Sequence, residues 1–103
     1  MEGVNRSTAE WIALGEHYVM GTYRRFPLVL TRGSGMRVWD CEGREYLDFI
    51  GGIAVCALGH SHPKVVEAIQ RQAATLTHVS NLYHIPPQIE LARLLVENSF
   101  AEK

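Results

Sequence analysis

Two histidines stand close together at the end of an apolar, glycine-rich stretch, DFIGGIAVCALGHSHP (48–63). Imidazole nitrogens bind transition metals, and the i, i+2 spacing of His60 and His62 would let both rings reach one ion from a strand. These two residues, however, flank the start of a predicted helix, and no cysteine or acidic residue stands beside them at a zinc-type spacing. The sequence therefore favours a structural role for His60 and His62, capping or packing the helix start, and predicts no metal site.

Two glycine-rich segments, RGSG (32–35) and FIGG (49–52), could form phosphate-binding loops. Such loops surround an anion with backbone N–H groups and have the pattern G-x-x-x-x-G-K-[ST], or G-x-G-x-x-G between a strand and a helix. Neither segment has this spacing. The first segment precedes a predicted strand, and this context favours a tight turn between strands.

The Gly51-Gly52 pair suggests another role for its segment. Two missing side chains would let another backbone or a flat ligand approach closely. Ile53 and Val55 then return to the alternation of a strand. The stretch is therefore either the wall of a pocket whose reacting groups lie elsewhere, or a buried strand that packs closely through its glycines. Composition alone leaves both readings open.

The size and composition of the chain indicate an ordinary globular domain. The chain has 103 residues, of which 47% are hydrophobic and 20% charged, and its formal net charge is −1. This length suits one small domain with a core. Because the charges are balanced and scattered, the sequence predicts no nucleic-acid partner and no anionic membrane partner.

Several features indicate a cytoplasmic location. The start, MEGVNRSTAEW, lacks the basic and then apolar pattern of an export signal. Glycines interrupt the apolar stretch 48–63, which is also too short to span a bilayer. Cys41 and Cys56 have no disulfide-framework spacing, so we expect free thiols in a reducing compartment.

Three helices are predicted from apolar periodicity and end signals, over 7–20, 61–78 and 86–100. The first opens with Ser7 and Glu10 at capping-box spacing. The other two carry proline in the first turn, where its missing N–H does no harm, and either Ser61 or His62 could cap the second. The second and third helices have broad apolar stripes, formed by Val65, Val66, Ile69 and Leu76 and by Ile89, Leu91, Leu94 and Leu95.

A small antiparallel sheet is predicted after the first helix. MRVWD (36–40) and EYLDF (45–49) alternate around Asp40-Cys41-Glu42-Gly43, which is a hairpin signature. Cys41 is then expected to be an exposed turn residue with no chemistry. Together with the helices, this pattern predicts an α+β fold.

The block from Gly33 to Gln72 reads G-x-G-x-x-x-W-D-x-x-G-x-x-Y-L-D-F-x-G-G-I-A-V-x-x-L-G-H-x-H-P-x-V-V-x-A-I-x-x-Q. It resembles the N-terminal region of class-III pyridoxal-phosphate aminotransferases. G-G-I-A-V, L-G-H-x-H-P and the later H-x-S-N-L-Y (78–83) resemble most closely the acetylornithine aminotransferases. The resemblance covers the chain from about Trp11 to its end, and the block as a whole is specific although each piece alone is weak.

The resemblance implies an α+β N-terminal segment of a fold-type-I enzyme of the α/β class, which works as a homodimer. Residues 1–60 would belong to the small domain, and residues 61–103 would be helices leading into the large cofactor-binding domain, which is absent. The implied reaction transfers the terminal amino group of N-acetylornithine to 2-oxoglutarate, a step of arginine biosynthesis. Its cofactor, pyridoxal 5'-phosphate, acts as the electron sink.

Members of this family are much longer than this chain, so the resemblance implies an N-terminal fragment. The family's Schiff-base lysine, its aspartate at the pyridine nitrogen, its carboxylate-binding arginine and its Ser-Gly-Thr phosphate loop would all follow Lys103. The two lysines present, Lys64 and Lys103, do not match the catalytic position. We therefore expect no catalytic and no cofactor-binding residue in this chain.

The residues that can be carried over from the family belong to the substrate pocket. Tyr23 matches a tyrosine that reaches the substrate in related omega-aminotransferases, although it could equally be a packing aromatic. Gly52 and Ile53 match a stretch that approaches the bound substrate. Ornithine aminotransferases tend to carry tyrosine at the position of Ile53, so isoleucine suits an acylated donor better. Asn81 matches a segment near the active-site mouth and the dimer contact.

Two other functions remain open. Another class-III enzyme, acting on ornithine, 4-aminobutyrate or succinyl-diaminopimelate, would share most of these motifs. Alternatively, the chain could be a non-catalytic interaction domain derived from such an enzyme, whose apolar helix faces dock on a partner.

Overall fold

The computed structural model describes residues 5–103, which divide into two compact units between Ala68 and Ile69. The division falls inside helix α3 (Pro63–Ala73) and lies C-terminal to the predicted boundary at residue 60. The assignment of these residues to a small and a large domain stays a prediction.

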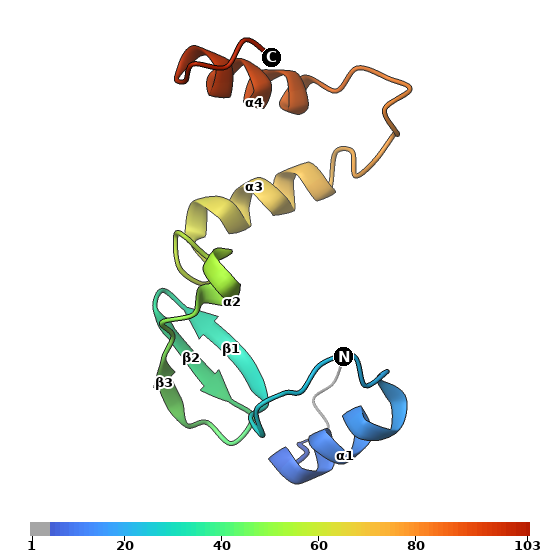
Figure 1. Cartoon of the computed structure of the whole chain (residues 1–103), viewed down its shortest axis with the longest axis vertical. Helices are drawn as coiled ribbons and strands as arrows, with labels where there is room; N and C mark the ends of the chain where they lie inside the picture. The colour runs from blue at the N-terminus through green and yellow to red at the C-terminus, as the bar shows by residue number, and fades with distance from the viewer. Residues whose placement is uncertain (1–4) are drawn as a thin grey trace. The chain divides into compact units, whose positions relative to one another are not determined.

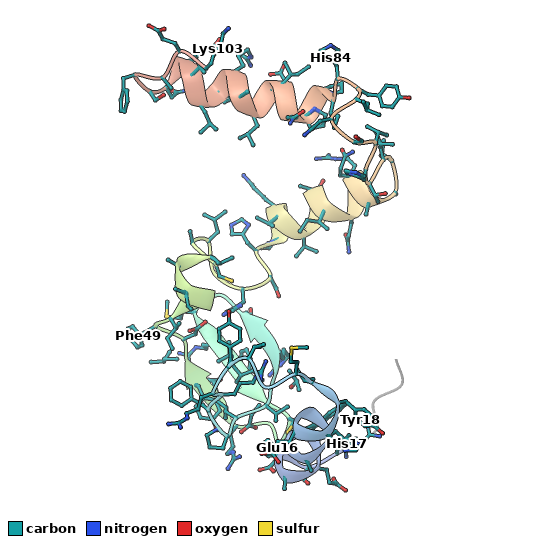
Figure 2. The ribbon with its side chains drawn as sticks, turned by 45° about the vertical axis from the view of Figure 1, so that its right-hand side comes forward. Glu16, His17, Tyr18, Phe49, His84 and Lys103 are labelled. Atoms are coloured by element: carbon teal, nitrogen blue, oxygen red, sulfur yellow. The ribbon has the colours of Figure 1, made fainter. Side chains whose placement is uncertain are left out.

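Helix α1 (Thr8–Tyr18) begins at the predicted capping box. The Ser7 hydroxyl accepts the backbone N–H of Glu10 at 3.3 Å, and the Glu10 carboxylate accepts the backbone N–H of Ser7 at 2.8 Å. The helix is shorter than the predicted 7–20, because the backbone turns to an extended conformation at Val19. Figure 2 shows the last residues of the helix, Glu16, His17 and Tyr18, with their side chains.

Three strands, β1 (Leu30–Ser34), β2 (Arg37–Asp40) and β3 (Glu45–Leu47), form an antiparallel sheet in the order β1-β2-β3 (Figure 1). The predicted hairpin is confirmed, since Val38 pairs with Tyr46 and Trp39 with Glu45. The sheet also holds the best-buried apolar side chain of the described residues, Val38, which is 7% exposed.

A single carboxylate organises the turn between β2 and β3. Asp40, 3% exposed, accepts the backbone N–H groups of Glu42 (3.0 Å) and Arg44 (2.9 Å), Nε of Arg44 (2.7 Å) and the hydroxyl of Tyr46 (2.8 Å). Burial by itself raises the pKa of Asp40, but the hydrogen bonds from Arg44, Tyr46 and Glu42 outweigh it and lower the pKa to about 2. This carboxylate is therefore ionised in the folded turn at neutral pH.

The prediction that Cys41 is an exposed turn residue is wrong, because the start of α1 covers this turn. Cys41 is half-buried, and its Sγ lies 3.4 Å from Oγ1 of Thr8. Thr8 also donates its backbone N–H to the Glu42 carboxylate at 3.3 Å. The backbone N–H of Cys41 donates to the carbonyl of Val29 at 2.8 Å, so the turn is also held by the segment that precedes β1.

Helices α3 and α4 (Pro86–Glu97) begin at the predicted prolines and end earlier than predicted, at Ala73 and Glu97. Neither contains a buried residue. The apolar stripes that the sequence predicts are thus largely open to solvent: Val65, Val66, Ile69, Leu76, Ile89, Leu91, Leu94 and Leu95. No helix among residues 5–103 has the length and apolar character needed to cross a bilayer.

Candidate functional site

The segment that could be a pocket wall or a buried strand folds as one left-handed helical turn, α2 (Gly51–Ala54). The strand interpretation is therefore wrong. Gly51, Gly52, Ile53 and Ala54 have φ values of +56°, +67°, +61° and +61°. Glycine adopts this conformation freely, whereas a β-branched residue such as Ile53 does so at a cost of roughly 1–2 kcal/mol. Strained residues of this kind cluster at functional sites.

The left-handed turn starts at the carboxylate of Asp48. Its Oδ1 accepts the backbone N–H groups of Ile50 and Gly51, each at 2.9 Å, and its Oδ2 lies 2.6 Å from Nε2 of His60. The backbone N–H of Asp48 in turn bonds the carbonyl of Met36 at 2.8 Å. The start of the turn is thereby tied to the β1–β2 connection and to a residue twelve positions later.

These contacts keep Asp48 ionised. Its pKa is lowered to about 2, chiefly by the hydrogen bond from the Gly51 backbone and then by those from His60 and Ile50, against an opposing effect of burial. With an ionised carboxylate as the only acceptor in the pair, Nε2 of His60 carries the shared proton and donates it.

His60 is itself locked in place by backbone contacts. It exchanges two hydrogen bonds with Gly35, N–H to carbonyl at 2.8 Å and carbonyl to N–H at 2.9 Å. A Cβ on Gly33 would lie 2.7 Å from Cβ of His60, and a Cβ on Gly59 would lie 2.9 Å from Cα of Gly35. Gly33 and Gly59 therefore allow this close approach, because a Cβ at either position would collide with its neighbour.

The segment between Asp48 and His60 is consequently a loop whose two ends are joined by a hydrogen bond. Its exposed side chains are apolar, and we call this set the apolar crown: Phe49, Ile50, Ile53, Val55 and Leu58. Phe49 is 94% exposed and Ile53 87% exposed, and Figure 2 shows the Phe49 ring standing out from the ribbon. Ile50, Val55 and Leu58 are exposed as well. A cleft of about 340 Å³ lies against the loop, and Met36, Asp48, Cys56 and His60 are among its lining residues.

The four predicted pocket residues fall in three places. Tyr23 lines a separate cleft of about 580 Å³ between α1 and residues 21–29. Gly52 and Ile53 share the left-handed turn and line neither cleft. Asn81, an exposed residue, lies in the loop between α3 and α4, in the second unit. Gly52 and Ile53 are therefore adjacent in α2, Tyr23 lines a different cleft, and the pocket roles of all four residues stay predictions.

His62 has a structural partner, as the sequence analysis expected. Its Nδ1 accepts the backbone N–H of Lys64 at 3.2 Å, which caps the first turn of α3. Across residues 5–103, no three side chains of the types His, Cys, Asp and Glu gather as potential metal ligands.

Asp48 belongs to this candidate site although no motif in the sequence predicts a role for it. An Asp commonly accepts the backbone N–H of the residue two positions later. The segment D-F-I-G-G therefore contains a local signal for the hydrogen bonds from Ile50 and Gly51 to Asp48. The bond to His60 spans twelve positions and had no local signal.

A comparison with protein-family profiles identifies residues 18–103 as a match to the family described as Aminotransferase class-III. The chain belongs to the class-III aminotransferase family. The match covers the sheet, the left-handed turn and the helices α3 and α4 in one continuous stretch.

Curated relatives of this aminotransferase chain carry a consistent name. The acetylornithine aminotransferase of Nostoc is 60% identical over 85 residues, which is 82% of this chain and 20% of the relative. That of Methanocaldococcus jannaschii is 54% identical over 93 residues, 90% of this chain and 23% of the relative. The chain thus spans about a fifth of the length of the curated relatives that it matches.

Solved class-III aminotransferase structures share the fold. The acetylornithine aminotransferase of Elizabethkingia anophelis aligns with a TM-score of 0.85 at 35% identity, over 89% of this chain and 23% of that one. The ornithine delta-aminotransferase of Plasmodium falciparum aligns with a TM-score of 0.75 at 32% identity, over 78% and 21%. The predicted fold class, a helix, a small antiparallel sheet and two further helices of such an enzyme, is confirmed.

Proposed function

We propose that this chain is the N-terminal portion of an acetylornithine aminotransferase, which moves the terminal amino group of N-acetylornithine to 2-oxoglutarate. One observation carries the proposal. Eight relatives with this name are 51 to 60% identical over 80 to 93% of the chain. The implied homodimer, the cytoplasmic location and the place in arginine biosynthesis belong to the same proposal.

In this proposal the chain supplies a wall of the donor pocket rather than the reacting groups. The crown of the left-handed turn is apolar, and Ile53 offers no hydrogen-bonding atom from its side chain. An apolar wall tolerates the neutral acylated nitrogen of N-acetylornithine, but it gives no partner to the α-ammonium of free ornithine, whose burial without a partner is costly. Isoleucine at this position therefore favours the acylated donor.

Pyridoxal 5'-phosphate, when bound, supplies the electron sink of the reaction. The described residues do not fit a complete site for it, because no lysine lines either cleft. Lys64 stands in the first turn of α3, where its backbone N–H bonds His62. The cofactor would accordingly be held by residues outside this chain.

Two alternatives have supporting observations. Solved ornithine aminotransferases share the fold, with 29% identity for the Plasmodium yoelii enzyme and 36% for that of Toxoplasma gondii, lower than the curated acetylornithine relatives. A non-catalytic interaction domain would explain the exposed apolar faces of α3 and α4. Sequencing the coding region past Lys103 separates enzyme from interaction domain, because only an enzyme would continue into a Ser-Gly-Thr loop and a later lysine.

The activity can be tested in a chimera in which residues 18–103 replace the matched segment of the Nostoc acetylornithine aminotransferase. We expect the purified chimera to transfer the amino group of N-acetylornithine to 2-oxoglutarate, and to use ornithine and 4-aminobutyrate poorly. A folded chimera that retains bound cofactor but prefers ornithine or 4-aminobutyrate would overturn the proposal in favour of another class-III enzyme.

A further inference from the structure

We propose that Asp48 and His60 are positioning residues for donor specificity, which hold the left-handed turn 51–54 and thereby the side chain of Ile53 on the pocket wall. This inference rests on the proposed function for the identity of the pocket. The holding of the turn itself follows from the geometry of the chain.

The turn needs an external support, because its own packing supplies little. Ile53 adopts a left-handed conformation that a β-branched residue avoids, and its side chain is 87% exposed. Among residues 5–103, buried contacts of the Ile53 side chain therefore do not offset the strain. Within the turn, two hydrogen bonds converge on the carbonyl of Gly51, from Val55 at 2.9 Å and Cys56 at 2.8 Å.

The Asp48 carboxylate fixes the backbone that precedes this carbonyl. It accepts the N–H groups of Ile50 and Gly51, so two successive peptide planes point at one oxygen. Such an arrangement defines the direction in which the chain enters the turn. Asp48 thus acts on Ile53 through the backbone.

His60 fixes the carboxylate. Its Nε2 lies 2.6 Å from Oδ2 of Asp48, and its side chain lies so close to β1 that a Cβ on Gly33 would come within 2.7 Å of its Cβ and Cγ. The paired backbone hydrogen bonds with Gly35 anchor His60 to the sheet. Through these contacts, His60 fixes the start of the turn relative to Gly35 in the β1–β2 connection.

The test uses the chimeric enzyme with three single substitutions. His60→Ala removes the donor to Asp48. His60→Gln replaces it with an amide nitrogen at a similar reach, and should restore the bond. His84→Ala, in the other unit (Figure 2), is the matched control. Hydrogen exchange of the peptide that covers residues 49–59 is measured for each, together with kcat/KM for N-acetylornithine and for ornithine.

We expect His60→Ala to speed exchange of this peptide about tenfold and to lower the ratio of kcat/KM for N-acetylornithine over ornithine about tenfold. His60→Gln should recover most of both changes, and His84→Ala should change neither. Asp48→Asn keeps one oxygen for the two N–H groups and should give smaller changes of the same sign. If His60→Ala does not fold, the same exchange and kinetic measurements on Asp48→Asn replace it.

Two results would overturn the inference. Unchanged exchange in both His60→Ala and Asp48→Asn would show that the pair does not hold the turn. Faster exchange with an unchanged donor ratio would show that the turn does not set specificity. Failure of the proposed function looks different, since the unsubstituted chimera would then lack a preference for N-acetylornithine while the exchange results still report on the turn.

Discussion

Nε2 of His60 donates a hydrogen bond of 2.6 Å to Oδ2 of Asp48, while the other oxygen of the same carboxylate accepts the N–H groups that open the left-handed turn. The Asp48 side chain therefore connects His60, which pairs with Gly35, to the backbone that enters the left-handed turn. The exposed apolar side chains of the loop, Ile53 among them, follow directly after the residues that Asp48 and His60 hold in place.

The lowered pKa values of Asp48 and Asp40, both about 2, predict a loss of stability in acid. A carboxylate whose pKa is lower in the folded state stabilises the fold above its unfolded pKa, near 4, and this stabilisation is lost as the pH falls toward 2. We expect the urea midpoint to fall steeply between pH 4 and pH 2. Asp40→Asn and Asp48→Asn should each flatten this dependence, and slopes equal to that of the unsubstituted chain would contradict the assignment.

Gly33→Ala should destabilise the chain by roughly 1–3 kcal/mol, because the new methyl group would lie 2.7 Å from Cβ and Cγ of His60 and push the ring off Asp48. Gly15→Ala is the control. It lies inside α1, where a Cβ meets nothing within 4 Å, and alanine should raise the free energy of unfolding by about 1 kcal/mol. Urea unfolding of both variants checks the contrast, and equal effects would contradict the close approach of His60 to β1.

The isolated chain should not form a Schiff base with pyridoxal 5'-phosphate at a specific lysine. Lys64 and Lys103 line neither cleft and match no catalytic position of the family. Incubation with the cofactor, borohydride reduction and peptide mapping would detect labelling. Stoichiometric modification of one lysine, accompanied by an aldimine absorbance band, would refute this expectation.

The isolated chain should self-associate at micromolar concentration. The apolar side chains along α3 and α4 are largely exposed, exposed apolar patches favour association, and a small three-stranded sheet is marginal without a covering layer. Sedimentation velocity and binding of a dye to apolar surface would measure this. A compact monomer with a sharp melt and no dye binding would show that the chain closes its own core.

The elements set by local sequence could be predicted, and those set by distant contacts could not. The capping box at Ser7 and the hairpin around Gly43 depend on residues a few positions apart, and both were predicted. The alternation of Ile53 and Val55 permits a strand, whereas the observed left-handed turn is contacted by a carboxylate whose partner, His60, lies twelve positions later in the chain. Likewise, Cys41 was expected to be exposed because the contact from Thr8 lies far along the chain.

The placement of Ile53 on the wall of the donor pocket is tested most directly by changing its side chain. In the chimera, Ile53→Tyr introduces the residue that ornithine aminotransferases tend to carry at this position. We expect the ratio of kcat/KM for N-acetylornithine over ornithine to fall about tenfold, because the phenol offers a polar partner and crowds the acyl group. A ratio that stays at the value of the unsubstituted chimera would contradict the placement of Ile53 on the donor pocket.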